Sequence, residues 1–126
     1  MLHLHSGTAY YWCQGKTDFR KSFDGLCGLV MLHLQREVTA GGVFIFVNKR
    51  RNQIKLLHWE GDGLAIYHKR LEKGLFEEPS QSKDGKAVLI DAEKLQLILQ
   101  GIVLNSVIKR KRYTHNSSYP QIKKDT

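Results

Sequence analysis

The chain has 126 residues, 41% of them hydrophobic and 25% charged, which is typical of one globular domain. Lys and Arg outnumber Asp and Glu by 20 to 12, giving a formal charge of +8, and such an excess attracts polyanions such as nucleic acid. The sequence contains neither a cationic and apolar leader nor an apolar run of ~20 residues, so we expect a cytoplasmic protein rather than an exported or membrane-spanning one. In that compartment we expect Cys13 and Cys27 to be reduced.

The first expected elements are a strand at about 9–13 and a helix at about 18–34. The strand is indicated by the aromatic run at its centre. Apolar residues then recur at helical spacing from Phe23 to Leu34, and Thr17 or Asp18 is a plausible N-cap. Gly25 and Gly28, which lower helix propensity, are expected where this helix approaches a sheet closely.

Three strands are expected next, at 43–47, 53–60 and 64–70. The first is apolar on both faces, which indicates a central strand. Turn residues separate the three strands, so we predict an antiparallel meander. Lys55, Lys69 and Arg70 interrupt the apolar pattern of the last two strands, as expected when one face of the sheet is solvated.

A short strand at 87–90 and a helix at about 91–104, capped by Asp91, complete the expected domain. The composition then changes to a basic and polar tail at 109–126. The predicted fold class is therefore α+β: a mainly antiparallel sheet packed with two helices in one domain over 1–108.

No motif indicates catalysis or a cofactor. Gly15-Lys16-Thr17 lacks the earlier glycine of a P-loop, and the histidine and cysteine spacings do not match a structural zinc site. The carboxylates are not grouped as metal-assisted hydrolysis requires. We therefore expect no enzyme, no metal and no cofactor, and a metal-dependent nuclease is only a weak alternative.

Clusters of basic residues are the strongest functional signal. One lies in the turn of the hairpin, one at the end of the third meander strand and one in the tail, and aromatic residues such as Trp59 and Tyr67 could stack on bases beside them. Arg20 and Lys21 are expected in the first helical turn, where they would bind an anion or pair with Asp18 or another carboxylate. The candidate nucleic-acid contacts are Arg20, Lys21, Lys49, Arg50, Arg51, Lys55, Lys69, Arg70, Lys73, Lys109, Arg110, Lys111 and Arg112.

Four blocks of sequence also carry a resemblance to a known family. The first two blocks are Thr17-Asp18-Phe19-Arg20-Lys21-Ser22-Phe23-Asp24-Gly25-Leu26 and Val43-Phe44-Ile45-Phe46-Val47-Asn48-Lys49-Arg50-Arg51. The other two are Lys55-Leu56-Leu57-His58-Trp59-Glu60-Gly61-Asp62-Gly63-Leu64 and Lys69-Arg70-Leu71-Glu72-Lys73-Gly74-Leu75-Phe76. Over about residues 9–104 the chain resembles the accessory proteins, called TnpB, that are encoded by the second open reading frame of insertion sequences of family sixty-six. These proteins are unrelated to the RNA-guided nuclease of the same name.

The resemblance implies a bacterial mobile-element protein that acts beside a separate transposase and has no assigned catalytic centre. It assigns no role to any residue. We therefore expect a non-catalytic accessory factor in DNA transposition, whose partners are element DNA and the transposase. A protein adaptor that contacts the transposase without touching DNA is the alternative.

Overall fold

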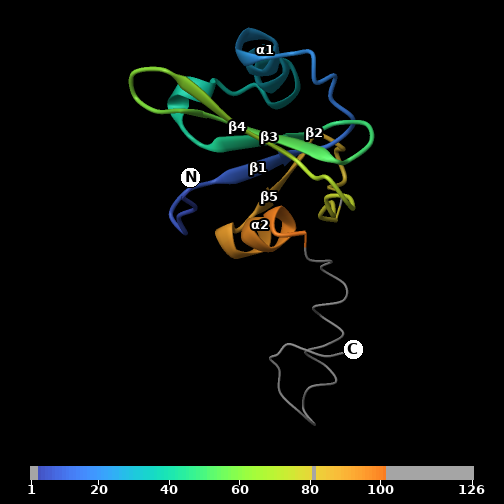
Figure 1. Ribbon diagram of the computed structural model, residues 1–126. Helices are drawn as coiled ribbons and strands as arrows, with labels where there is room; N and C mark the ends of the chain where they lie inside the picture. Colours follow the sequence, from blue (N-terminus) through green and yellow to red (C-terminus); the bar gives the residue numbers. More distant parts are fainter. Residues whose placement is uncertain (1–2, 81, 102–126) are drawn as a thin grey trace.

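The fold is a five-stranded mixed sheet with one helix on each face, as Figure 1 shows. It was obtained as a computed structural model, which describes residues 3–80 and 82–101. The strands lie in the order β4-β3-β2-β1-β5. The predicted α+β class, with a sheet that is mostly antiparallel, is confirmed. Within the described residues, no helix is both long and apolar enough to cross a membrane.

The secondary-structure elements follow the sequence predictions closely. The meander strands and the last strand are found where they were expected, and the helices are shorter than expected. The elements are β1 (Tyr10–Cys13), α1 (Phe23–Leu34), a short 3-10 helix (Val38–Ala40), β2 (Val43–Val47), β3 (Gln53–Trp59), β4 (Leu64–Arg70), β5 (Ala87–Ile90) and α2 (Ala92–Leu99).

The centre of the sheet is the parallel pair formed by β1 and β2, in which Tyr10 lies opposite Val43 and Trp12 opposite Ile45. The other strand pairs of this sheet are antiparallel. Parallel neighbours require a crossover connection, and here that connection contains α1. Every residue of β2 is buried, so the prediction of a central strand covered on both faces is confirmed.

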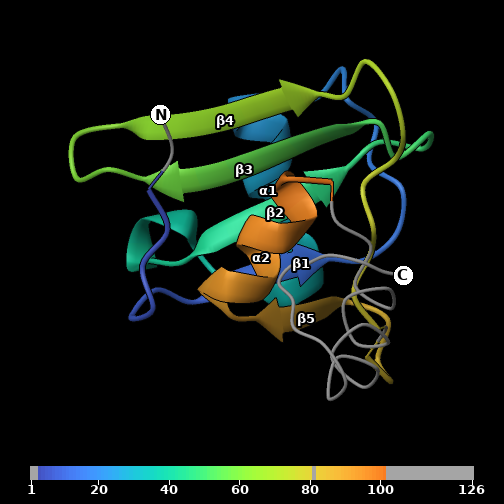
Figure 2. The same cartoon turned by 60° about the horizontal axis from the view of Figure 1, so that its bottom comes forward.

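Side chains alternate between two cores, one under each helix. Under α1, the residues Leu26 and Val30 pack with Phe44, Phe46 and Leu57 of the sheet. On the opposite face, which Figure 2 shows with α2 lying across the sheet, Leu95, Ile98 and Leu99 pack with the other side of β1, β2 and β3. Both faces are therefore covered in the middle of the sheet.

Three local expectations are wrong. The first helix begins at Phe23, after an N-cap at Ser22 that makes no side-chain hydrogen bond, so neither Thr17 nor Asp18 caps it. Arg20 and Lys21 consequently precede the helix instead of lying in its first turn. The meander is not solvated along one whole face either, because α1 and α2 cover both sides of its middle, although His68 and Arg70 at the end of β4 are exposed. The second helix ends at Leu99, earlier than expected, and residues 102–104 lie outside the described part of the chain.

The glycines of α1 do not lie against the sheet, which is another departure from the sequence prediction. A Cβ atom on Gly28 would meet nothing within 4 Å, and one on Gly25 would meet only the side chain of Lys21. The sterically demanding glycine is Gly42, just before β2. Its φ is +92°, and a Cβ atom there would lie 2.9 Å from the ring of Tyr11.

These two environments predict opposite effects of the same substitution. Gly28→Ala is expected to stabilise the protein by about 0.5–1 kcal/mol, because alanine loses less backbone entropy in a helix interior. Gly42→Ala is expected to destabilise it by more than about 1 kcal/mol, because the new methyl group is strained at positive φ and collides with Tyr11. Urea unfolding of both variants measures the difference, and equal effects would contradict it.

Candidate functional site

One end of the sheet collects loops from distant parts of the sequence. β1, β2 and β4 end there, while β3 and β5 begin there, as the pairing directions require. Four connecting segments therefore meet at this end: 14–17, 48–52, 71–76 and 82–86.

Backbone hydrogen bonds join these segments directly. Thr17 N–H donates to the carbonyl of Val47 at 3.1 Å, and Gln14 N–H donates to that of Lys86 at 3.0 Å. Leu71 N–H donates to the carbonyl of Asn52 at 2.8 Å. The loops are thus held together by the same kind of bond that holds the sheet, which fixes their relative positions.

The turn between β2 and β3 is fixed by its own side chains. Asn48 Nδ2 donates to Asn52 Oδ1 at 2.7 Å, and Asn48 Oδ1 accepts from the backbone N–H of Gln53 at 3.0 Å. Arg51 adopts a left-handed φ of 61° and donates its N–H to the carbonyl of Asn48 at 3.0 Å. Lys49 and Arg50 are therefore exposed on a well-defined turn.

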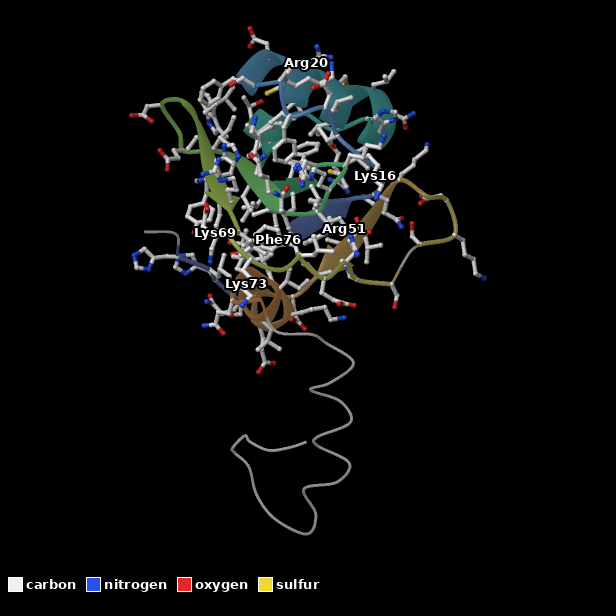
Figure 3. The ribbon with its side chains drawn as sticks, turned by 45° about the vertical axis from the view of Figure 1, so that its right-hand side comes forward. Lys16, Arg20, Arg51, Lys69, Lys73 and Phe76 are labelled. Carbon is white, nitrogen blue, oxygen red and sulfur yellow. The ribbon has the colours of Figure 1, made fainter. Side chains whose placement is uncertain are left out.

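Phe76 anchors the segment that follows β4 to this turn. Its side chain is 0% exposed in the core on the α2 side, and its N–H donates to the carbonyl of Arg51 at 2.7 Å. Figure 3 shows Phe76 next to Arg51, and Lys73, three residues earlier in the same segment, beside α2. The exposed Lys73 therefore belongs to the same end of the molecule as the turn.

Sequence reasoning missed three cations at this end, because no local pattern connects them to the turn. Lys16 lies beside Val47 only through the parallel pairing of β1 and β2, and Lys83 and Lys86 lie there because β5 pairs with β1. We call the following set the basic end: Lys16, Lys49, Arg50, Arg51, Lys73, Lys83 and Lys86.

Two of the predicted contacts are already paired with carboxylates. Arg20, whose side chain is 91% exposed, bonds Asp18 at 2.7 Å, and this guanidinium lowers the pKa of Asp18 to about 2. Arg70 bonds Glu72 at 3.1 Å. Of the two roles considered for Arg20, pairing with Asp18 is the one observed.

Lys55 and Lys69 have structural contacts instead of free ammonium groups. Lys55 is 7% exposed, and its Nζ donates to the carbonyls of Phe19 at 3.1 Å and Lys21 at 2.9 Å. Burial lowers the pKa of this lysine. Lys69 Nζ donates to the carbonyl of Leu99 at 2.9 Å, at the last turn of α2. Lys55 thus fixes the segment before α1, and Lys69 fixes the end of α2.

The candidates outside the basic end are scattered. Arg20 lies on the α1 side of the sheet, whereas Lys69 lies on the α2 side (Figure 3). Lys21 is exposed just before α1. Trp59 lies at the opposite end of the sheet, and Tyr67 packs on the core under α2. Lys109, Arg110, Lys111 and Arg112 lie outside the described residues.

The cysteine and histidine side chains of the described residues form no reactive or metal-binding cluster. Burial raises the pKa of the Cys13 thiol to about 12, and both cysteines are free. Burial, followed by the charges of Lys55 and Arg70, lowers the pKa of His68. Residues 3–80 and 82–101 place no three His, Cys, Asp or Glu side chains where they could ligate one metal ion.

The contacts of Lys55 predict a clear difference between two lysines. Lys55→Met keeps most of the side-chain volume but leaves two carbonyls without their donor, and is expected to destabilise the fold by about 1–3 kcal/mol. Lys49→Met, on the exposed turn, is expected to change stability by less than about 0.5 kcal/mol. Urea unfolding distinguishes them, and a Lys55→Met variant as stable as Lys49→Met would show that the buried contacts contribute nothing.

Comparisons with known proteins add independent information. The sequence model of the family described as "IS66 Orf2 like protein" matches residues 8–109. Among curated proteins, the chain is 35% identical over 85 residues to "Uncharacterized protein y4jC" of Sinorhizobium fredii, covering 68% of this chain and 71% of that protein. It is 32% identical over 102 residues to "Uncharacterized protein y4hO" of the same organism, covering 81% and 87%. No solved structure matches the chain.

Proposed function

The chain belongs to the IS66 Orf2-like family of insertion-sequence accessory proteins, and from this premise we propose that it is a non-catalytic factor that assists transposition by contacting DNA through its basic end. The single observation that supports the contact is the joining of four cation-bearing loops at one end of the sheet. The transposase is the protein partner that this role calls for.

The cations of the basic end are suited to phosphate because carboxylates do not occupy them. Arg20 and Arg70 each bond a neighbouring carboxylate, whereas among the described residues Lys16, Lys49, Arg50, Arg51 and Lys73 form no ion pair. An unpaired surface cation gives up only water and counterions when it meets a phosphate. These side chains therefore have more to contribute to DNA binding than the paired arginines.

The rigidity of the turn also favours binding. The asparagine bonds around the turn and the bond from Phe76 to Arg51 hold the backbone of the turn through contacts within the protein. Binding then orders only the side chains of Lys49 and Arg50, so the entropic cost is smaller than for a mobile loop.

The predicted contacts in the C-terminal tail stay a prediction, because Lys109, Arg110, Lys111 and Arg112 lie outside the described part of the chain.

The proposal predicts that removing two cations from the turn weakens DNA binding. Lys49→Ala with Arg50→Ala is expected to lower affinity for a duplex from the element end, and to flatten the plot of log affinity against log salt by roughly 0.9 for each phosphate that the variant no longer neutralises. Fluorescence anisotropy at several salt concentrations measures both. The structure favours Lys49 and Arg50 over Arg51 as targets, because Arg51 has positive φ and bonds Phe76.

The matched control removes the same charge elsewhere. Arg36→Ala with Lys94→Ala removes two charges outside segments 14–17, 48–52, 71–76 and 82–86, and is expected to change the salt slope less than Lys49→Ala with Arg50→Ala does. If both pairs weaken binding equally, net charge rather than the basic end is responsible; if neither does, the adaptor role without DNA contact is favoured. The duplex is expected to stay intact with magnesium or manganese, and cleavage would support the nuclease alternative.

A further inference from the structure

One part of the sheet has no helix over it. Five strands about 4.8 Å apart make a sheet roughly 20 Å wide, whereas a helix covers about 10 Å. On its face, α1 packs on β2, β3 and β4, through residues such as Phe46, Leu57 and Ile66. Among the described residues, no second helix lies beside α1 over β1 and β5 (Figure 1).

A groove occupies that space. Two adjoining hollows, of about 170 and 350 Å³, share His33, Leu34 and Lys86 in their linings. One continues over Cys13 and Leu29 toward Lys16, and the other over Tyr11 toward Arg36 and Leu89. We call the whole the α1–β5 groove.

Apolar side chains border this groove on both sides. On β5, Leu89 is 64% exposed, and it lies opposite Tyr11 of β1. On α1, Leu29 and His33, spaced i and i+4, line the groove from one flank of the helix. Arg36 lines it from the segment beyond the end of α1 at Leu34.

The charged groups at the groove are mainly cationic. Lys16, Arg36 and Lys86 line it, and none of the three forms an ion pair with a described carboxylate. The guanidinium of Arg36 lies 4.6 Å from the centre of the Tyr11 ring. Among the described residues, the only carboxylate of the lining is that of Asp84, which already accepts from Ser82 Oγ at 2.6 Å and from Lys86 N–H at 3.0 Å.

We propose that the α1–β5 groove binds an amphipathic helix of a partner protein, with leucine-type side chains facing Leu29 and Leu89 and acidic residues facing Lys16, Arg36 and Lys86. Such a helix would lie beside α1 at ordinary helix-packing distance and complete the layer over the sheet. The groove shares Lys16 and Lys86 with the basic end, and it differs from that surface in its apolar borders.

The charge of the groove favours an acidic partner helix over a second copy of the chain, its own C-terminal residues or a nucleic acid. A second copy would place Arg36 and Lys86 against cations of the same kind, and residues 102–126 of the chain are themselves rich in Lys and Arg. A nucleic acid would satisfy the cations but would leave the exposed Leu89 uncovered. An acidic helix with an apolar stripe satisfies both features.

The test uses the full chain and a fluorescein-labelled helical peptide of about 18 residues, with leucines at i, i+3, i+4 and i+7 and glutamates on both flanks. Saturable binding by anisotropy is expected. Leu89→Ser, and separately Arg36→Glu with Lys86→Glu, are each expected to weaken it at least about tenfold. A lysine-flanked version of the peptide is expected to bind the charge-reversed variant better than the original chain. Lys49→Ala with Arg50→Ala is the matched control and should bind the glutamate peptide normally.

Several results would contradict the binding of a partner helix in the groove. The proposal is overturned if the glutamate peptide does not saturate, if a peptide of the same composition in scrambled order binds as well, or if Leu89→Ser binds unchanged. It is also overturned if sedimentation shows a dimer of the original chain that Leu89→Ser dissociates, since the occupant is then a second copy. Loss of duplex binding in Leu89→Ser, with circular dichroism unchanged, would identify the groove as a nucleic-acid surface instead.

Discussion

The parallel pairing of β1 with β2 is the constraint on which the rest of the molecule depends. A parallel pair needs a crossover, and this requirement sends the chain from Cys13 through α1 before it returns at Val43. It also places Gln14 to Thr17 beside the end of β2, where the hairpin turns, and leaves β5 to pair on the outer side of β1. The basic end and the α1–β5 groove both follow from this one pairing: the first because strand ends coincide, the second because α1 covers β2 to β4 and stops short of β5.

Much of the fold could be predicted from local patterns. The strands of the meander are found at their predicted positions, because glycine and asparagine turns bound short runs rich in apolar residues. The start of α1 could not be predicted, because the decisive contacts are long-range: Lys55 on β3 holds the carbonyls of Phe19 and Lys21 in an extended segment before the helix. Nothing in the local sequence of Lys55 distinguishes a buried lysine from an exposed one.

The candidate site, too, could be predicted only in part from local sequence patterns. The turn at Lys49 and Arg50 is visible in the sequence as a run of basic residues, whereas Lys16, Lys83 and Lys86 join it only through strand pairing. The structure also sorts cations that look alike in the sequence. Lys55 and Lys69 bond backbone carbonyls, Arg20 and Arg70 bond carboxylates, and the cations of the turn remain available to a partner. Family membership indicates the process in which the protein takes part. The distinction between paired and unpaired cations indicates which surface would bind a polyanion.

The central claim, that DNA meets the basic end, is tested most directly by mapping the contact residue by residue. Isotope-labelled protein titrated with a duplex from the element end would report the shift of each backbone amide. We expect the largest shifts in segments 14–17, 48–52, 71–76 and 82–86, with little change around Trp59 or along α1 and around Leu89, which border the α1–β5 groove away from those segments. Shifts centred on α1 and Leu89, or spread evenly over the surface, would contradict the claim.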